Sequence, residues 1–329
     1  MSTTDPIQIQ IENLAVEYRT RGGAVRALDG ADLRLDGQSS LGIVGESGSG
    51  KTTLGMAIGR LLPERCERVA GDLRIGDASV FELQPEELRQ LRRQSLGFVF
   101  QNPMTALDPT MRVGKQLEHS VGHRLDRERV MELLSKVGLP EPERVARSYP
   151  HELSGGMAQR VVIAFAIARR PSLLIADEPT SALDATVREG VLVLLTGMRE
   201  LFGTGLVLLS HELWVVAAHC DEVAVMYGGR IVEHGPARLL FERPCHPYTI
   251  ALLRAAPGRE RQGQRLEPIA GMPPLLRAAA PGCAFVSRCA FAIERCRTER
   301  PERQQVDGRV VLCHRASEVA AATDGGRPR

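Results

Sequence analysis

The feature that most constrains the fold is a glycine-rich stretch over residues 45–52, with the pattern G-x-x-x-x-G-K-T. A short apolar run, Leu41–Val44, precedes it, and apolar residues at helical spacing follow it. This order predicts a strand, a loop and a helix. The stretch therefore indicates an α/β fold in which the loop leaves the end of a buried strand.

The residue types in this loop suit phosphate binding. Glycines let successive amides converge on phosphate oxygens at a helix N-terminus, and Lys51 adds a compact positive charge. The hydroxyl of Thr52 can bind Mg²⁺. An incidental glycine-rich turn would not explain the fixed spacing. The predicted nucleotide-contacting residues are Gly45, Glu46, Ser47, Gly48, Ser49, Gly50, Lys51, Thr52 and Thr53.

Composition excludes several classes of protein. The chain has 329 residues, of which 43% are hydrophobic, and a net charge of +2. This balance gives no electrostatic case for nucleic-acid binding. The longest apolar run, residues 161–168, is too short to span a bilayer, and the first residues lack a signal-peptide pattern. We therefore expect a cytoplasmic protein that reaches a membrane only through partners.

Three further apolar segments, each with the length of a buried strand, end in polar residues. One carboxylate at such an end can hold Mg²⁺, and a second can polarise the water that attacks a phosphate. A glutamine or a histidine can contact the metal, the water or the phosphate, although both are also ordinary residues for the end of a strand. These candidates are Gln101, the adjacent pair Asp177 and Glu178, and His211.

Two smaller features add candidates for the same chemistry. Ser154, Gly155 and Gly156 precede a predicted helix over 157–170. Serine caps a helix, and the free amides form a second anion site; capping alone explains the serine but not the paired glycines. Tyr18 follows the predicted strand over 7–16. Its ring can stack on a nucleotide base or simply pack, and both interpretations stay open.

The chain divides by composition into three parts. Residues 1–255 contain all the motifs above and include a predicted helical insertion at about 102–170. Prolines become frequent beyond residue 236, and residues 256–319 are predicted to form a small extension. The last segment, 320–329, is polar enough to be a disordered tail.

Four of the seven cysteines lie in this extension. Their spacing lacks the C-x-x-C pair of a zinc ribbon, yet four thiolates can hold a zinc ion or an iron–sulfur cluster. Such a ligand set would stabilise a short segment with few large apolar residues, and we prefer it to four ordinary small residues. The four are Cys283, Cys289, Cys296 and Cys313; Cys66, Cys220 and Cys245 are expected to be packing residues.

In this order, the motifs resemble those of the ATP-binding-cassette (ABC) ATPases over about residues 7–255. Three stretches are similar to the subfamily that drives oligopeptide and dipeptide importers: FQNPMTALDP (100–109), LSGGMAQR (153–160) and HPYTIALL (246–253). The cysteine pattern of the extension also resembles this subfamily, in which some relatives bind a four-iron cluster. The resemblance implies a P-loop α/β core with an antiparallel β subdomain and a helical insertion.

The resemblance also implies a role for each candidate residue. Tyr18 would stack on adenine, and Lys51 with the loop amides would hold the phosphates of ATP. Glu178 would be the catalytic base, and His211 would contact the γ-phosphate. Residues that serve Mg²⁺ would be Thr52, Gln101 and Asp177; those that reach the nucleotide of a partner subunit, or couple the two sites, would be Ser154, Gly155, Gly156 and Asp184.

The assembly that the resemblance implies is a membrane importer. A second, related ABC ATPase, two membrane permease subunits and an extracytoplasmic solute-binding protein would be its other parts. The chain would lie on the inner face of the plasma membrane, and the 101–120 region would pass motion to the permeases. Nickel, haem or another solute could replace peptides, and a soluble complex such as the one for phosphonate breakdown is a further alternative.

Overall fold

The structure, a computed structural model, describes residues 8–121, 126–181, 183–256, 268–274 and 281–324. They form two compact units. The phosphate-loop unit comprises residues 8–35, 39–82 and the described residues from 208 onward. The carboxylate unit comprises residues 36–38 and the described residues from 83 to 207. The chain last crosses from one unit to the other within strand β8 (Gly205–Ser210).

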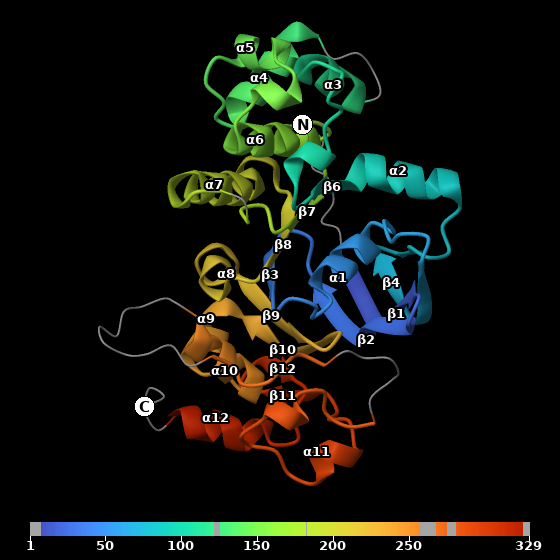
Figure 1. Cartoon of the computed structure of the whole chain (residues 1–329), viewed down its shortest axis with the longest axis vertical. Coiled ribbons are helices and arrows are strands. Elements are labelled where there is room, and N and C mark those ends of the chain that lie inside the picture. Colours follow the sequence, from blue (N-terminus) through green and yellow to red (C-terminus); the bar gives the residue numbers. More distant parts are fainter. Residues whose placement is uncertain (1–7, 122–125, 182, 257–267, 275–280, 325–329) are drawn as a thin grey trace. The chain divides into compact units, whose positions relative to one another are not determined.

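One sheet of the phosphate-loop unit is antiparallel, with the strand order β2-β1-β4-β5 (Figure 1). Ile9 and Ile11 are both 1% exposed and alternate with a less buried residue, as the sequence pattern predicts. The first strand extends beyond its predicted end because its pairing with the second continues to the turn after Thr20. The strands are β1 (Ile9–Thr20), β2 (Gly23–Leu35), β4 (Cys66–Ile75) and β5 (Ala78–Ser79).

The other sheet of this unit carries the phosphate loop. Its strand order here is β11-β12-β10-β9-β3, in which β3 and β9 are parallel and the remaining neighbours are antiparallel. Every residue of β3 is buried, which accounts for its unbroken apolar run. Strands β11 and β12 come from the predicted extension. The bounds are β3 (Ser40–Val44), β9 (Glu222–Tyr227), β10 (Arg230–Pro236), β11 (Gln304–Val306) and β12 (Arg309–Val311).

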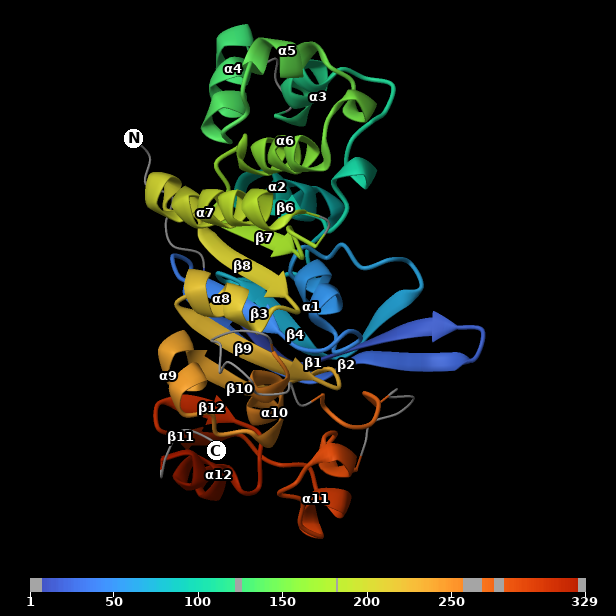
Figure 2. The ribbon, with the colours of Figure 1, turned by 60° about the vertical axis from the view of Figure 1, so that its left-hand side comes forward.

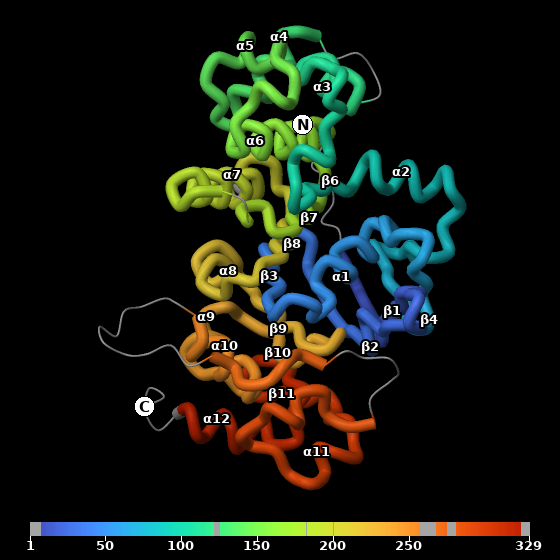
Figure 3. Tube along the Cα trace, viewed as in Figure 1, coloured from blue at the N-terminus to red at the C-terminus, as the bar shows by residue number. Residues whose placement is uncertain are grey.

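Short helices complete the phosphate-loop unit, and Figure 3 traces the extension from α11 through β11 to α12. The helices are α1 (Lys51–Ile58), α8 (Leu213–His219), α9 (Ala237–Glu242), α10 (Pro247–Ala255), the 3₁₀ turn η3 (Val286–Arg288), α11 (Arg295–Thr298) and α12 (Ala316–Asp324). The prediction of a disordered tail is wrong for residues 320–324. They belong to α12, whose Ala316 and Ala320 pack in a small core with Cys245 and Val311. Residues 325–329 lie outside the described residues.

In the carboxylate unit, strands β6 (Leu96–Val99) and β7 (Leu173–Asp177) are parallel, and β8 follows beside β7. Helices α3, α4 and α5 gather on one side of α6 (Figure 2), and α6 contacts α3, α4 and α7. In the part of the chain that the structure covers, no helix has the length and apolar character to cross a membrane. The helices are α2 (Pro85–Ser95), η1 (Pro103–Thr105), α3 (Val113–Ser120), α4 (Arg127–Lys136), α5 (Pro142–Arg147), η2 (Pro150–Glu152), α6 (Gly155–Ile167) and α7 (Ala185–Phe202).

Candidate functional site

The phosphate loop connects β3 to α1, and two of its glycines are required for different reasons. A Cβ atom on Gly45 would lie 2.1 Å from the carbonyl oxygen of Met226, so only glycine fits there. Gly50 precedes the first turn of α1 with a φ of +106°, which other residues rarely adopt. Gly45 is therefore required because the Met226 backbone approaches it closely, and not because of the backbone freedom that the sequence predicts.

The ammonium group of Lys51 lies within this loop. Its Nζ donates hydrogen bonds to the carbonyl oxygens of Gly45 (2.7 Å) and Glu46 (3.1 Å), and the residue is only 6% exposed. Among the residues that the structure describes, the buried hydroxyl of Ser49 has no hydrogen-bond partner. Because an unbonded buried hydroxyl costs free energy, the loop has unused bonding capacity beside a positive charge. Both features suit a phosphate group.

Around the loop, Ser47, Gly48 and Thr52 are exposed, whereas Thr53 is buried. The hydroxyl groups of Thr53 and Tyr18 lie 3.1 Å apart, which fixes the tyrosine to the first turn of α1. Burial raises the pKa of the Tyr18 phenol. Stacking of this ring on adenine stays a prediction. His211, also exposed, directly follows β8 in the same unit.

The carboxylate unit brings two predicted site residues into contact. Asp177 is the buried last residue of β7, and Glu178 follows it with a φ of +43°. Such a left-handed conformation is strained for glutamate, and strain of this kind is concentrated at functional sites. Gln101, just beyond the neighbouring parallel strand, donates from Nε2 to Oε2 of Glu178 at 3.2 Å. Both side chains therefore lie at the carboxyl ends of adjacent strands.

The Ser-Gly-Gly segment forms the start of α6. The Ser154 side chain accepts a hydrogen bond from the Met157 amide at 3.3 Å, so the serine is the predicted cap. Ser154 and Gly155 are exposed. A Cβ on Gly156 would lie 2.6 Å from Cγ1 of Val187, so close packing against α7 explains the second glycine. Asp184 is exposed and caps α7.

The four cysteines of the extension gather around one cavity of about 10 Å³. All are free thiols, and burial raises the pKa of Cys283, of Cys289 and, to about 12, of Cys313. Among the described residues, no three histidine, cysteine or acidic side chains are arranged to hold a metal ion. The structure therefore brings the predicted ligand residues together without forming a metal centre.

Sequence reasoning missed the contact between the extension and the phosphate loop. The phenol oxygen of Tyr248 accepts the Glu46 amide hydrogen at 2.9 Å, and the guanidinium of Arg288 binds the Glu46 carboxylate. Residues 46 and 288 are 242 positions apart, and neither belongs to a motif that predicts pairing. Only the fold reveals this contact.

The carboxylate unit also contains an open groove of about 630 Å³. Phe98, Phe100 and Phe165 contribute apolar surface to it. Four arginines line it as well: Arg89, Arg92, Arg93 and Arg169. Burial, together with the charge of Arg93, lowers the pKa of Arg169. The groove is therefore both apolar and strongly basic, a combination that suits an amphipathic acidic segment.

Comparison with known families agrees with this geometry. Residues 28–181 match a family described as ABC transporter. Residues 232–296 match another described as oligopeptide/dipeptide transporter, C-terminal region. The first match includes the phosphate loop, Gln101 and Glu178, and the second includes Tyr248 and Arg288.

Curated relatives are similar over nearly the whole chain. The chain is 40% identical over 316 residues to the oligopeptide transport ATP-binding protein OppD of Escherichia coli K12, covering 94% of each protein. It is 40% identical over 320 residues to the probable peptide ABC transporter ATP-binding protein y4tR of Sinorhizobium fredii, covering 94% of this chain and 96% of that protein. The OppD of Mycobacterium tuberculosis is 41% identical over 327 residues, but the chain spans only 53% of that relative's length.

Solved structures are similar over most of the chain. The ATP-binding cassette MJ0796, a dimer in a post-hydrolysis state bound to ADP and Pi, has a TM-score of 0.63 and 29% identity. The likeness covers 70% of this chain and 99% of that one. The cbiO1 protein of Clostridium perfringens has a TM-score of 0.61 and 27% identity, covering 71% of this chain and 90% of that one.

Proposed function

We propose, from the premise that the chain belongs to the ATP-binding proteins of ABC transporters, that it binds and hydrolyses ATP to drive peptide import. The observation that carries the proposal is the loop at the start of α1, with its buried Lys51 ammonium and a Ser49 hydroxyl that no described residue hydrogen-bonds. A positively charged donor and an available hydroxyl at a helix N-terminus are suited to bind the phosphates of a nucleotide.

Within this proposal the candidate residues take the following roles. Lys51 and the loop amides bind the phosphates, Tyr18 stacks on adenine, and His211 contacts the γ-phosphate. Glu178 accepts a proton from the attacking water, and its contact with the Gln101 amide orients the carboxylate. Exposed Ser154 and Gly155, with Gly156 and Asp184, serve the nucleotide of a second ATPase subunit.

The proposed magnesium ligands are hard oxygen donors, which is the chemistry that this ion prefers. They are the hydroxyl of Thr52, the side-chain oxygen of Gln101 and the carboxylate of Asp177. When bound, Mg²⁺ neutralises charge on the phosphate oxygens. The chain's own contribution is to hold Asp177 buried at the end of β7.

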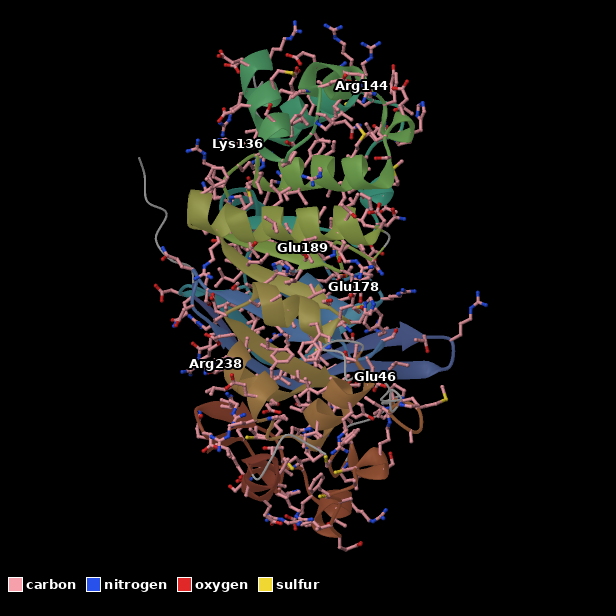
Figure 4. All side chains as sticks on the ribbon, turned by 90° about the vertical axis from the view of Figure 1, so that its left-hand side faces the viewer. Glu46, Lys136, Arg144, Glu178, Glu189 and Arg238 are labelled. Atoms are coloured by element: carbon pink, nitrogen blue, oxygen red, sulfur yellow. The ribbon has the colours of Figure 1, made fainter. Side chains whose placement is uncertain are left out.

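Glu178→Gln tests the catalytic part of the proposal. The variant should bind ATP like the parent, while hydrolysis falls on the order of 10²- to 10⁴-fold because the base is lost. Glu189→Gln is the matched control, since Glu189 is an exposed glutamate of α7 in the same unit; Figure 4 labels both residues. Retained hydrolysis in the Glu178 variant would refute the assignment of the base.

Peptide import and its partners are supported by the second family match and by the names of the relatives. The proposed complex contains two permease subunits, a related ATPase and a solute-binding protein, and the chain lies on the inner face of the membrane. The basic, apolar groove of the carboxylate unit suits the attachment of a permease. Tagging the chain in its native cell and identifying co-purified proteins tests this; recovery with soluble enzymes alone would contradict it.

We further propose that the four cysteines of the extension bind a zinc ion or an iron–sulfur cluster. It is supported by the convergence of four thiols on one cavity, although the cavity is water-sized and the thiols would have to turn toward a common point. Anaerobic purification followed by iron, sulfide and zinc analysis is the test. Metal-free protein that is normally folded would identify the cysteines as packing residues.

A further inference from the structure

Glu46 is held at three points within the phosphate-loop unit. Its amide donates to the phenol oxygen of Tyr248 at 2.9 Å, and its carbonyl oxygen accepts a hydrogen bond from Lys51 at 3.1 Å. Its carboxylate oxygens accept two hydrogen bonds from Arg288, at 2.7 and 3.0 Å. The residue therefore links the lysine of the loop directly to the C-terminal extension.

Every nitrogen of the Arg288 guanidinium donates hydrogen bonds that hold the side chain in place. Nη1 and Nη2 each bind one oxygen of Glu46. Their second hydrogens reach the Tyr227 hydroxyl (3.2 Å) and the Ile269 carbonyl (3.2 Å), and Nε donates to the Ala270 carbonyl at 2.8 Å. The side chain is 3% exposed. The Glu46 side chain is 25% exposed, so only the arginine side of this contact is shielded from water. A two-pronged, charge-assisted contact fixes both the distance and the orientation of its acceptor.

Three aromatic rings support this contact. The ring centroids of Tyr227 and Tyr248 lie 4.5 Å apart, and Phe285 lies 5.1 Å from the first and 5.3 Å from the second. Phe285 is 2% exposed and also lines the cysteine cavity. The extension thus contributes Phe285 to this aromatic cluster, in addition to the arginine, and the two tyrosines come from β9 and α10.

We propose that Arg288 is a positioning residue for ATP binding, and that the C-terminal extension is thereby part of the nucleotide site; this rests on the proposed ATPase function. With the Glu46 carboxylate clamped, the carbonyl that holds Lys51 is fixed and the loop is ordered before the nucleotide arrives. Without the clamp, ATP binding has to order the loop, and that cost lowers affinity. The chemical step does not involve Arg288, so kcat stays close to that of the parent.

The test uses the full-length chain and its Glu46→Gln, Arg288→Gln and double variants, with ATP affinity and steady-state hydrolysis measured for each. Each single variant should bind ATP on the order of tenfold more weakly, with KM raised and kcat nearly unchanged. The double variant should be no worse than either single one, because both remove the same contact. Arg295→Gln is the control, since Arg295 is an exposed arginine of the extension that pairs only with Glu299 among the contacts described.

Glu46→Gln keeps the inference testable if Arg288→Gln fails to fold, because it leaves the three other partners of the guanidinium in place. A folded Glu46→Gln chain with the parent's ATP affinity would overturn the inference, as would losses that add in the double variant. In both cases a parent that hydrolyses ATP would leave the proposed function intact. A parent that does not bind ATP would overturn both.

Discussion

Mild acid should destabilise the phosphate-loop unit through His246, which caps helix α10. The ring is 1% exposed, and its Nδ1 accepts the backbone N–H of Tyr248 at 3.0 Å. Burial lowers the pKa of His246 from 6.5 to about 3, despite a hydrogen bond with the backbone of Leu312. The folded state therefore keeps the ring neutral, whereas the unfolded chain takes up a proton near its ordinary pKa.

The sign and size of the effect follow from these two values. Because the unfolded state binds more protons, stability is complete above about pH 6.5 and falls as the pH drops toward 3. A single group with these pKa values loses about 2 kcal/mol between pH 8 and pH 5. This is a substantial share of the 5–15 kcal/mol that is typical of a folded domain.

The assay is urea unfolding at pH 8 and pH 5, followed by the fluorescence of Trp214. This is the only tryptophan in the chain, and it lies on α8 of the same unit. In a His246→Asn variant, asparagine still accepts the helix N–H but does not titrate. The variant should be less stable at pH 8, yet lose about 2 kcal/mol less than the parent on acidification. Equal losses in parent and variant would refute the reasoning.

Two further predictions concern glycines. Gly45→Ala should weaken ATP binding by roughly tenfold or more, because its Cβ would lie 2.1 Å from the Met226 carbonyl oxygen; an unchanged binding titration would contradict this. Gly156→Ala should destabilise by about 1–3 kcal/mol through overpacking, with its Cβ 2.6 Å from Val187. In Gly155→Ala the new Cβ meets nothing closer than 3.9 Å, so this variant should be destabilised less. Equal melting temperatures for the two variants would contradict the prediction, because they would show that α7 moves aside without cost.

Local patterns predicted much of the architecture. The loop between β3 and α1 lies where the glycine and lysine spacing places it, since each residue type there meets a local requirement. The apolar run before Asp177 is a fully buried strand, and the parallel neighbour that precedes Gln101 brings the amide to Glu178. Periodicity and strand-end chemistry are sufficient for such features because their determinants are close in sequence.

Contacts between distant parts of the chain could not be predicted. Nothing near Arg288 indicates that its acceptor is Glu46, and the close approach that requires Gly45 comes from Met226 on another strand. The tail was misjudged for the same reason. Ala320, within the predicted tail, is a small residue in a segment rich in polar residues, and it becomes core only because Val311 and Cys245 belong to the same cluster.

The pairing of β12 with β10 also determines how the sheet ends. Glu233 and His234 of β10 pair with Val311 and Val310, so the extension covers the middle of a seven-residue strand whose backbone would otherwise be open to another molecule. The new edge, β11, is only three residues long, and short edge strands are poor templates for aggregation. A chain cut after α10 would lose this protection. We therefore expect the extension to reduce self-association through an open sheet edge, independently of anything it does for the nucleotide.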